Sequence, residues 1–222
     1  MENPWIRLPN MAPFVSPDDI THIEKFNSSQ PQATKLETDL IPEPYLGNPN
    51  APILLLNLNP GYDPREVPYH NSDNHFISLS RANLVHADMK YPFYLLDPSI
   101  SFSLGHQWWS RKLKPLIQSA SPAAVARSLF CVEYFPYHSR RYRFSKTSFP
   151  SQGYSFWLAS QSILTAETIV LMRGARYWFS QFPTLEHHPK LIELQSVQNV
   201  TISQRNCTKG YQLLESIVRS HI

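Results

Sequence analysis

The 222-residue sequence has little of several features that would place it in a familiar class. It contains two cysteines, Cys131 and Cys207, which excludes a disulfide scaffold and any zinc site or iron–sulfur cluster held by four cysteines of one chain. No apolar run reaches the length of a bilayer span, and the first residues lack the charged, then apolar, pattern of a secretory signal. We therefore expect a cytoplasmic protein with reduced thiols and no membrane partner.

Several motifs of enzyme chemistry are also missing. The sequence has no Gly-x-Gly-x-x-Gly, no phosphate loop and no Gly-x-Ser-x-Gly elbow. His187 and His188 are adjacent and would point apart, and no other histidine pair has the spacing of metal ligands on a helix. The sequence predicts neither a metal nor a cofactor.

The composition is that of a folded globular chain, with 42% hydrophobic and 13% aromatic residues. The 20 prolines outnumber the 6 glycines and indicate long, stiff connections. The net charge of +3 mildly favours an anionic partner, although small proteins without one often carry the same charge.

Four short apolar segments are predicted to be strands: 53–58, 128–135, 167–172 and 198–203. Helices are predicted from Ser16-Pro17 onward, around 106–118 with a break at Pro115, over 151–165 and 174–182, and from Thr208 with Leu213, Leu214, Ile217 and Val218 facing inward. Residues 59–105 show little periodicity and are expected to be an irregular segment that lines or covers a site.

This pattern predicts an α/β fold: a three-layer αβα sandwich around a central, mainly parallel four-stranded sheet. A single domain would span residues 1–222, with 1–50 as a helical or irregular extension packed on it. Ligands of such folds bind beyond the carboxyl ends of the strands. The segments that follow the four predicted strands are polar or basic: 59–63, 133–139, 173–176 and 204–209.

The stretch "LLLNLNPG" resembles the first motif of the uracil-DNA glycosylase superfamily, in particular its branch of mismatch-specific uracil and thymine glycosylases. The segments "SFSLG", "LFCVEYF", "ETIVLMRGARYW" and "VTISQRNCTKGY" follow in the order of that family's later segments. The resemblance covers roughly residues 50–220 and implies hydrolysis of an N-glycosidic bond after a base is flipped into a pocket. Three departures stand out: Asn57 replaces a glycine, Glu133 replaces the pocket asparagine, and residues 204–207 replace the histidine-containing second motif.

The resemblance and the strand-end positions give a set of candidate residues. The catalytic candidates are Asn59, which would orient a water, Asp63 as a reserve base or merely a turn residue, and Asn206, since either Arg205 or Asn206 would steady the leaving base or a phosphate. Candidates for substrate binding are Asn57, Gly61, Tyr62, Phe93, Phe102, Glu133 and Arg205. Candidates for contact with a nucleic-acid backbone are Arg140, Arg141, Arg143, Lys146 and Lys209.

Glu133 leaves three alternatives open. An ionised glutamate only accepts hydrogen bonds, so in the pocket it would prefer a base edge rich in donors and would make plain uracil a poor substrate. It could instead be a protonated donor, or it could turn away to pair with Arg140, Arg141 or Arg173.

Two functions follow from these residues. The first is a monofunctional DNA N-glycosylase acting on a damaged or modified base. The second is a non-catalytic protein that keeps the fold and binds a nucleobase, a nucleotide or nucleic acid. The expected partner is nucleic acid, DNA in preference to RNA, or a free nucleobase or nucleotide; the oligomeric state is left open.

Overall fold

The computed structural model describes residues 1–142 and 147–221. Its strands are β1 Tyr45–Gly47, β2 Ile53–Asn57, β3 Leu129–Glu133, β4 Thr168–Leu171 and β5 Leu191–Glu193. Its α-helices are α1 Ile20–Ser28, α2 Val67–Ser72, α3 Asn74–Leu84, α4 Leu104–Lys112, α5 Lys114–Ser119, α6 Pro122–Ser128, α7 Gln152–Thr165, α8 Ala175–Gln181 and α9 Tyr211–Arg219.

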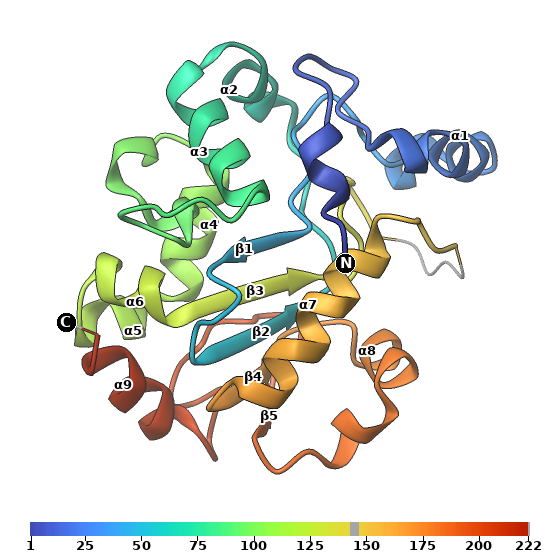
Figure 1. Cartoon of the computed structure of the whole chain (residues 1–222). Helices are drawn as coiled ribbons and strands as arrows, with labels where there is room; N and C mark the ends of the chain where they lie inside the picture. The colour runs from blue at the N-terminus through green and yellow to red at the C-terminus, as the bar shows by residue number, and fades with distance from the viewer. Residues whose placement is uncertain (143–146, 222) are drawn as a thin grey trace.

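The strands form one sheet in the order β1-β3-β2-β4-β5 (Figure 1). Four of the strands, β3, β2, β4 and β5, run parallel, and β1 lies antiparallel to β3 at the edge. Asn83 of α3 covers the free side of β1: its Nδ2 donates to Tyr45 O (2.8 Å), and Gly47 N donates to its Oδ1 (3.1 Å). This side chain takes the place of a neighbouring strand, so the exposed edge is closed.

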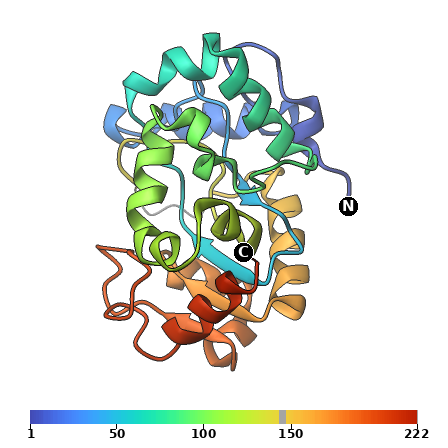
Figure 2. The same ribbon diagram turned by 90° about the vertical axis from the view of Figure 1, so that its left-hand side faces the viewer.

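Helices cover both faces of the sheet because alternate residues of each central strand point to opposite sides. Leu54 and Leu56 of β2 pack with α7, α8 and the N-terminal segment, whereas Ile53 and Leu55 pack with α4, α5, α6 and α9. Figure 2 views the molecule from the side of this second group, whose green helices and red C-terminal helix lie near the viewer. The αβα sandwich predicted from the sequence is confirmed.

One of the four predicted strands, 198–203, is wrong, and two strands of the sheet, β1 and β5, were missed. The sheet contains five strands among the described residues, and 198–203 is not one of them. Val200 and Ile202 are buried as a strand pattern would require, but Ile202 N donates to Lys112 O at the end of α4 (2.9 Å). The place beside β4 is taken by β5, and β1 was missed because it is only three residues long.

The helix predictions held where start and stop signals were strong. Leu113 separates α4 from α5, two residues before Pro115, and α7 and α8 lie where they were expected. The segment 59–105 was wrongly expected to be irregular, since it contains α2 and α3. The last helix begins at Tyr211, not Thr208, and its Leu213 is 48% exposed instead of facing inward.

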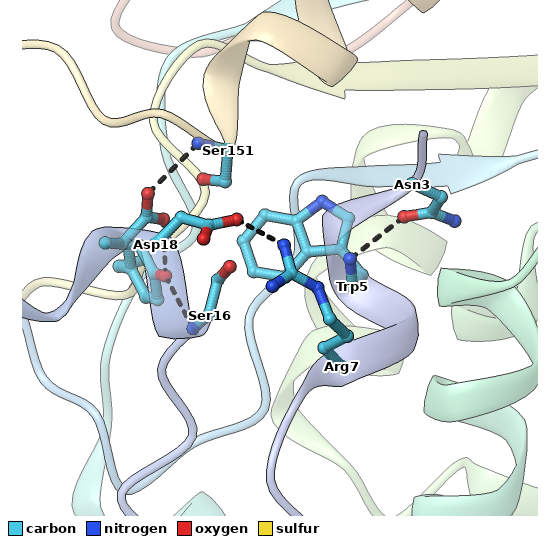
Figure 3. A network of polar contacts seen from close by, with 8 residues as sticks. Asn3, Trp5, Arg7, Ser16, Asp18 and Ser151 are labelled. Carbon is cyan, nitrogen blue, oxygen red and sulfur yellow. Dashed lines mark hydrogen bonds and ion pairs between the residues drawn. The ribbon is translucent and has the colours of Figure 1, made fainter. Parts of the chain in front are cut away.

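The N-terminal segment is fixed to the sheet layer by a buried carboxylate. Asp19 accepts hydrogen bonds from Tyr137 Oη (2.7 Å) and from Ser151 N (3.0 Å), and Tyr137 Oη also accepts from Ser16 N (3.1 Å). Figure 3 shows this region, with Ser16, Asp18 and Ser151 labelled. Trp5 and Phe14 belong to the same core cluster as the strands, so residues before β1 help to build the main core.

Candidate functional site

A cavity of about 720 Å³ opens at the carboxyl ends of β2 and β3. Its walls come from the corner after β2, η4 (Pro64–Glu66), helix α4, the segment after β3 and Arg173, two residues after β4. The polar and aromatic residues that line it are Glu43, Asn57, Asn59, Tyr62, Asp63, Arg65, Glu66, Gln107, Trp108, Trp109, Arg111, Glu133, His138, Ser139, Arg140, Tyr142 and Arg173. The cavity therefore lies where ligands of parallel α/β sheets bind.

Two buried side chains from neighbouring strands meet in this cavity. Asn57 and Glu133 are register partners at the ends of β2 and β3, and Asn57 Nδ2 donates to Glu133 Oε1 (2.8 Å). Each side chain is 3% exposed, and Asn57 Oδ1 and Glu133 Oε2 are buried without a partner among the described residues. Buried polar atoms of this kind normally have partners, so this pair leaves two oxygens that could each form a further hydrogen bond.

Three carboxyl groups in the cavity titrate near neutral pH. Burial raises the pKa of Glu133 to about 8, assisted by the nearby Glu43 and opposed by the hydrogen bond from Asn57 and by Arg173. Burial also raises the pKa of Glu43 and of Glu66 to about 7 each. Tyr94 Oη donates to Glu43 (3.1 Å), and Gly105 N donates to Glu66 (3.1 Å). Carboxyl groups of this kind can donate as well as accept near pH 7.

Asn59, the residue predicted to orient a water, lies in the corner that follows β2. Its Nδ2 donates to Pro60 O and to Ser139 Oγ, both at 2.9 Å. A carbonyl oxygen only accepts, so the contact with Pro60 fixes the amide nitrogen on that side. Its Oδ1 has no hydrogen bond among the described residues, and Asn59 is one of the residues that line the cavity.

His138 connects the corner to the chain before β1. Its Nδ1 faces Gly61 O (2.6 Å) and its Nε2 faces Ile41 O (3.0 Å). Both partners are carbonyl oxygens, which only accept, so a ring nitrogen donates to its partner only where it carries a proton. The positive charge of His138 lowers the pKa of Glu66 against the larger effect of burial.

The remaining oxygens at the corner are already engaged. Both carboxylate oxygens of Asp63 accept from the Arg65 guanidinium (2.9 and 2.7 Å), and Arg65 N donates to Asp63 Oδ1. These bonds lower the pKa of Asp63 to about 2, which makes it a poor base. Asp63 caps η4, so the turn role is the one its contacts support.

Aromatic and cationic groups form the outer part of the cavity. The Arg140 guanidinium lies 4.7 Å from the Tyr62 ring centre and pairs with Glu37 (3.3 Å), while Tyr62 Oη donates to Asp39. Gly61 is exposed, and a Cβ added to it would meet no atom within 4 Å. The glycine therefore leaves open space at the wall and is not required by its backbone conformation.

Other candidates lie away from the cavity. Phe93 is fully buried against Trp109, and Phe102 is 42% exposed and packs edge-on against Tyr69. Asn206 is buried in its own loop, where it donates to Asn199 O and Thr201 O and accepts from Ser196 N. Arg205, Lys209 and Arg141 are exposed and do not line the cavity. Arg143 and Lys146 lie outside the described residues.

The sequence missed several residues of the cavity wall. Glu43, Glu66 and Arg111 do not follow a strand, and the segment with Trp108 was assigned only to a helix. A cluster of at least three His, Cys, Asp or Glu side chains arranged to hold a metal does not occur within 1–142 and 147–221.

In the described part of the chain, no helix combines the length and the apolar character needed to cross a membrane. Comparisons with protein-family models, curated proteins and solved structures found no match to this chain.

Proposed function

We propose that the cavity holds a nucleobase and that the chain acts as a monofunctional DNA N-glycosylase of the uracil-DNA glycosylase type. The observation that carries the proposal is the corner at Asn59. The amide nitrogen of Asn59 has two acceptors, its Oδ1 has no partner among the described residues, and Asn59 lines the same cavity as Asn57 and Glu133, whose Oδ1 and Oε2 also lack a partner there. A water-orienting acceptor thus lies beside groups able to bind a planar polar ring.

The open positions of Asn57 and Glu133 favour one kind of base edge. Glu133 keeps its proton near pH 7 because its pKa is raised to about 8. Since Oε1 accepts from Asn57, a proton on Oε2 gives a donor beside the acceptor Asn57 Oδ1. A base that presents C=O next to N–H, such as uracil or hypoxanthine, complements this pair. Of the three alternatives for Glu133, the protonated donor has the most support. A preference for a base edge with an amino group would apply only to ionised Glu133.

The reaction would require little acid–base chemistry from the protein. Asn59 Oδ1 accepts a hydrogen bond from a water, whose oxygen bonds to the anomeric carbon of the sugar. The glycosidic C–N bond breaks, its electron pair leaves with the base, and the water's released proton passes to the base or the solvent. The Oε2–H of Glu133 would stabilise the charge that develops on the base oxygen.

A non-catalytic binding protein is the second candidate, and one observation favours it. The residues at the place of the family's second catalytic motif do not line the cavity: Arg205 is exposed and Asn206 is used in its own loop. Binding would then persist without cleavage of the glycosidic bond.

The partner and the location remain proposals. Arg111 and Arg173 line the cavity and are in no ion pair of the described residues, which supports an anionic ligand that we take to be DNA in preference to RNA, or a free nucleotide. Cys131 and Cys207 are buried, unpaired thiols, which suits the reducing cytoplasm.

An oligonucleotide panel distinguishes the two functions. Fluorescent strands that carry uracil, hypoxanthine, xanthine or hydroxymethyluracil are incubated with the protein and then cleaved at any abasic site. We expect abasic product from at least one strand and a rate about 100-fold or more lower for Asn59→Ala, the scale on which a misplaced reactant slows an enzyme. Asn50→Ala, at an exposed asparagine before β2, is the matched control.

The opposite results are equally informative. Retention of the strands without abasic product would support the binding protein. No retention and no product would reject both functions, and equal rates for Asn59→Ala and Asn50→Ala would reject the role of Asn59.

A further inference from the structure

Three cationic side chains gather on the α4 side of the cavity mouth. Arg111 and Lys112 end α4, and Arg173 follows β4. The Lys112 Nζ lies 5.7 Å and the Arg173 Cζ 5.9 Å from the ring centre of Trp108, which itself lines the cavity together with Arg111 and Arg173. Residues more than 60 positions apart in the printed sequence thus meet around one indole ring.

These cations lack acidic partners in the described part of the chain. The ion pairs found there join Arg7 to Asp18, Arg65 to Asp63, Arg140 to Glu37 and Arg219 to Glu215. Lys112 Nζ donates instead to the neutral Asn199 Oδ1 (2.8 Å), and Arg173 donates to Gln198 O at 3.5 Å. Neither of these acceptors carries a negative charge, and the interaction of Arg173 with Glu133 is not a contact ion pair.

The cluster carries an electrostatic cost that an anion would relieve. Burial lowers the pKa of Lys112, and the charges of Arg111 and Arg173 lower it further. The dipole of α4 favours Arg111 and Lys112 at its C-terminal end. The helix dipole does not account for Arg173, which lies after β4 and also lines the cavity.

We propose that Arg111, Lys112 and Arg173 form a phosphate-binding site at the cavity mouth, beside Trp108, for the phosphate of the nucleotide whose base enters the cavity. The nucleotide part of this inference rests on the proposed function. The planar guanidinium groups suit phosphate oxygens because they offer paired N–H donors. None of these three residues is among the backbone contacts expected from the sequence, which are Arg140, Arg141, Arg143, Lys146 and Lys209.

The first test compares ligands with and without phosphate. Deoxyuridine, deoxyuridine 5′-monophosphate and a deoxyuridine-containing strand are titrated into wild type, Arg111→Gln and Arg173→Gln. Lys114→Gln is the matched control, since Lys114 is exposed, begins α5 and does not line the cavity. Circular dichroism checks that each variant is folded, and Arg111→Gln is the safer one because Arg111 is exposed.

We expect the two arginine variants to lose about tenfold or more in affinity for the monophosphate or the strand, the usual effect of losing a charge-assisted hydrogen bond. Deoxyuridine affinity should stay at the wild-type level. For the strand, the slope of log affinity against log salt should fall by about 0.7 per lost contact. A loss with the strand alone assigns the site to an internal phosphodiester, and a loss with both ligands assigns it to any nucleotide phosphate.

The inference is overturned if both arginine variants match Lys114→Gln on the strand and on the monophosphate. Inorganic pyrophosphate separates this result from failure of the proposed function. If no nucleoside binds but pyrophosphate binding is lost in Arg111→Gln and kept in Lys114→Gln, the phosphate site stands without the nucleobase. If pyrophosphate does not bind to the wild type either, the site is rejected.

Discussion

Glu133 offers a prediction that depends on the cavity's physics and not on its ligand. The pKa of this carboxyl rises from 4.5 to about 8 in the folded chain, chiefly through burial. Between these values the folded chain keeps a proton that the unfolded chain has released, so the free energy of unfolding falls as the pH rises. Below 4.5 and above about 8 the group contributes no slope.

The magnitude follows from the same numbers. The interval from 4.5 to about 8 spans about 3.5 pH units, and one unit corresponds to about 1.4 kcal/mol, which gives a ceiling of about 5 kcal/mol. Water entering the cavity reduces this value. Glu43 and Glu66 add slopes of the same sign up to about pH 7, so removing Glu133 should lower the combined slope from the three groups by roughly a third.

The perturbation is Glu133→Gln, which keeps an oxygen for the hydrogen bond from Asn57 and cannot ionise. Urea denaturation at a series of pH values between about 5 and 8 gives the free energy of unfolding. We expect the variant to resemble the wild type at the acidic end and to be more stable by several kcal/mol near pH 8. Glu186→Gln, at an exposed glutamate, should follow the wild type. Parallel curves for Glu133→Gln and wild type would refute the reasoning.

Three further predictions follow from the structure. Gly47→Ala should lower the free energy of unfolding in urea by several kcal/mol, because Gly47 has φ +97° and an added Cβ would lie 2.2 Å from Leu129 O. Gly61→Ala, with open space at its Cβ, should change it by less than about 0.5 kcal/mol. Equal losses for the two variants would contradict this. Asp19→Ala should lower the free energy of unfolding by about 3 kcal/mol, because the buried Tyr137 hydroxyl and Ser151 amide lose their acceptor. Asp18→Ala, which removes an exposed ion pair with Arg7, should lower it by at most about 1 kcal/mol. A smaller loss for Asp19→Ala than for Asp18→Ala would show that the buried network does not hold the N-terminal segment. Affinity for a base with adjacent C=O and N–H groups should fall as the pH rises through about 8, where Glu133 loses its donor proton. Calorimetric titration should show no such pH dependence for Glu133→Gln. Affinity that stays constant across this range in the wild type would oppose the protonated form.

The sequence by itself determined the central strands and the place of the site. The runs that became β2, β3 and β4 are short and largely apolar, as is typical of strands covered on both faces, and they imply helices on both sides. Parallel strands end at one edge of the sheet, so Asn59 and Glu133 could be expected to share a cavity, and both line it.

Only the tertiary structure decided the edges of the sheet and the chemistry of the cavity. Residues 191–193 and 198–203 are short segments with two aliphatic residues each. Nothing local shows that 191–193 pairs with β4 whereas the amide of Ile202 donates to the end of α4. The raised pKa values of Glu43, Glu66 and Glu133 depend on how completely distant parts of the chain enclose them. Enclosure and charge clustering are sums over neighbours that the fold assembles, and no local pattern in the sequence records them.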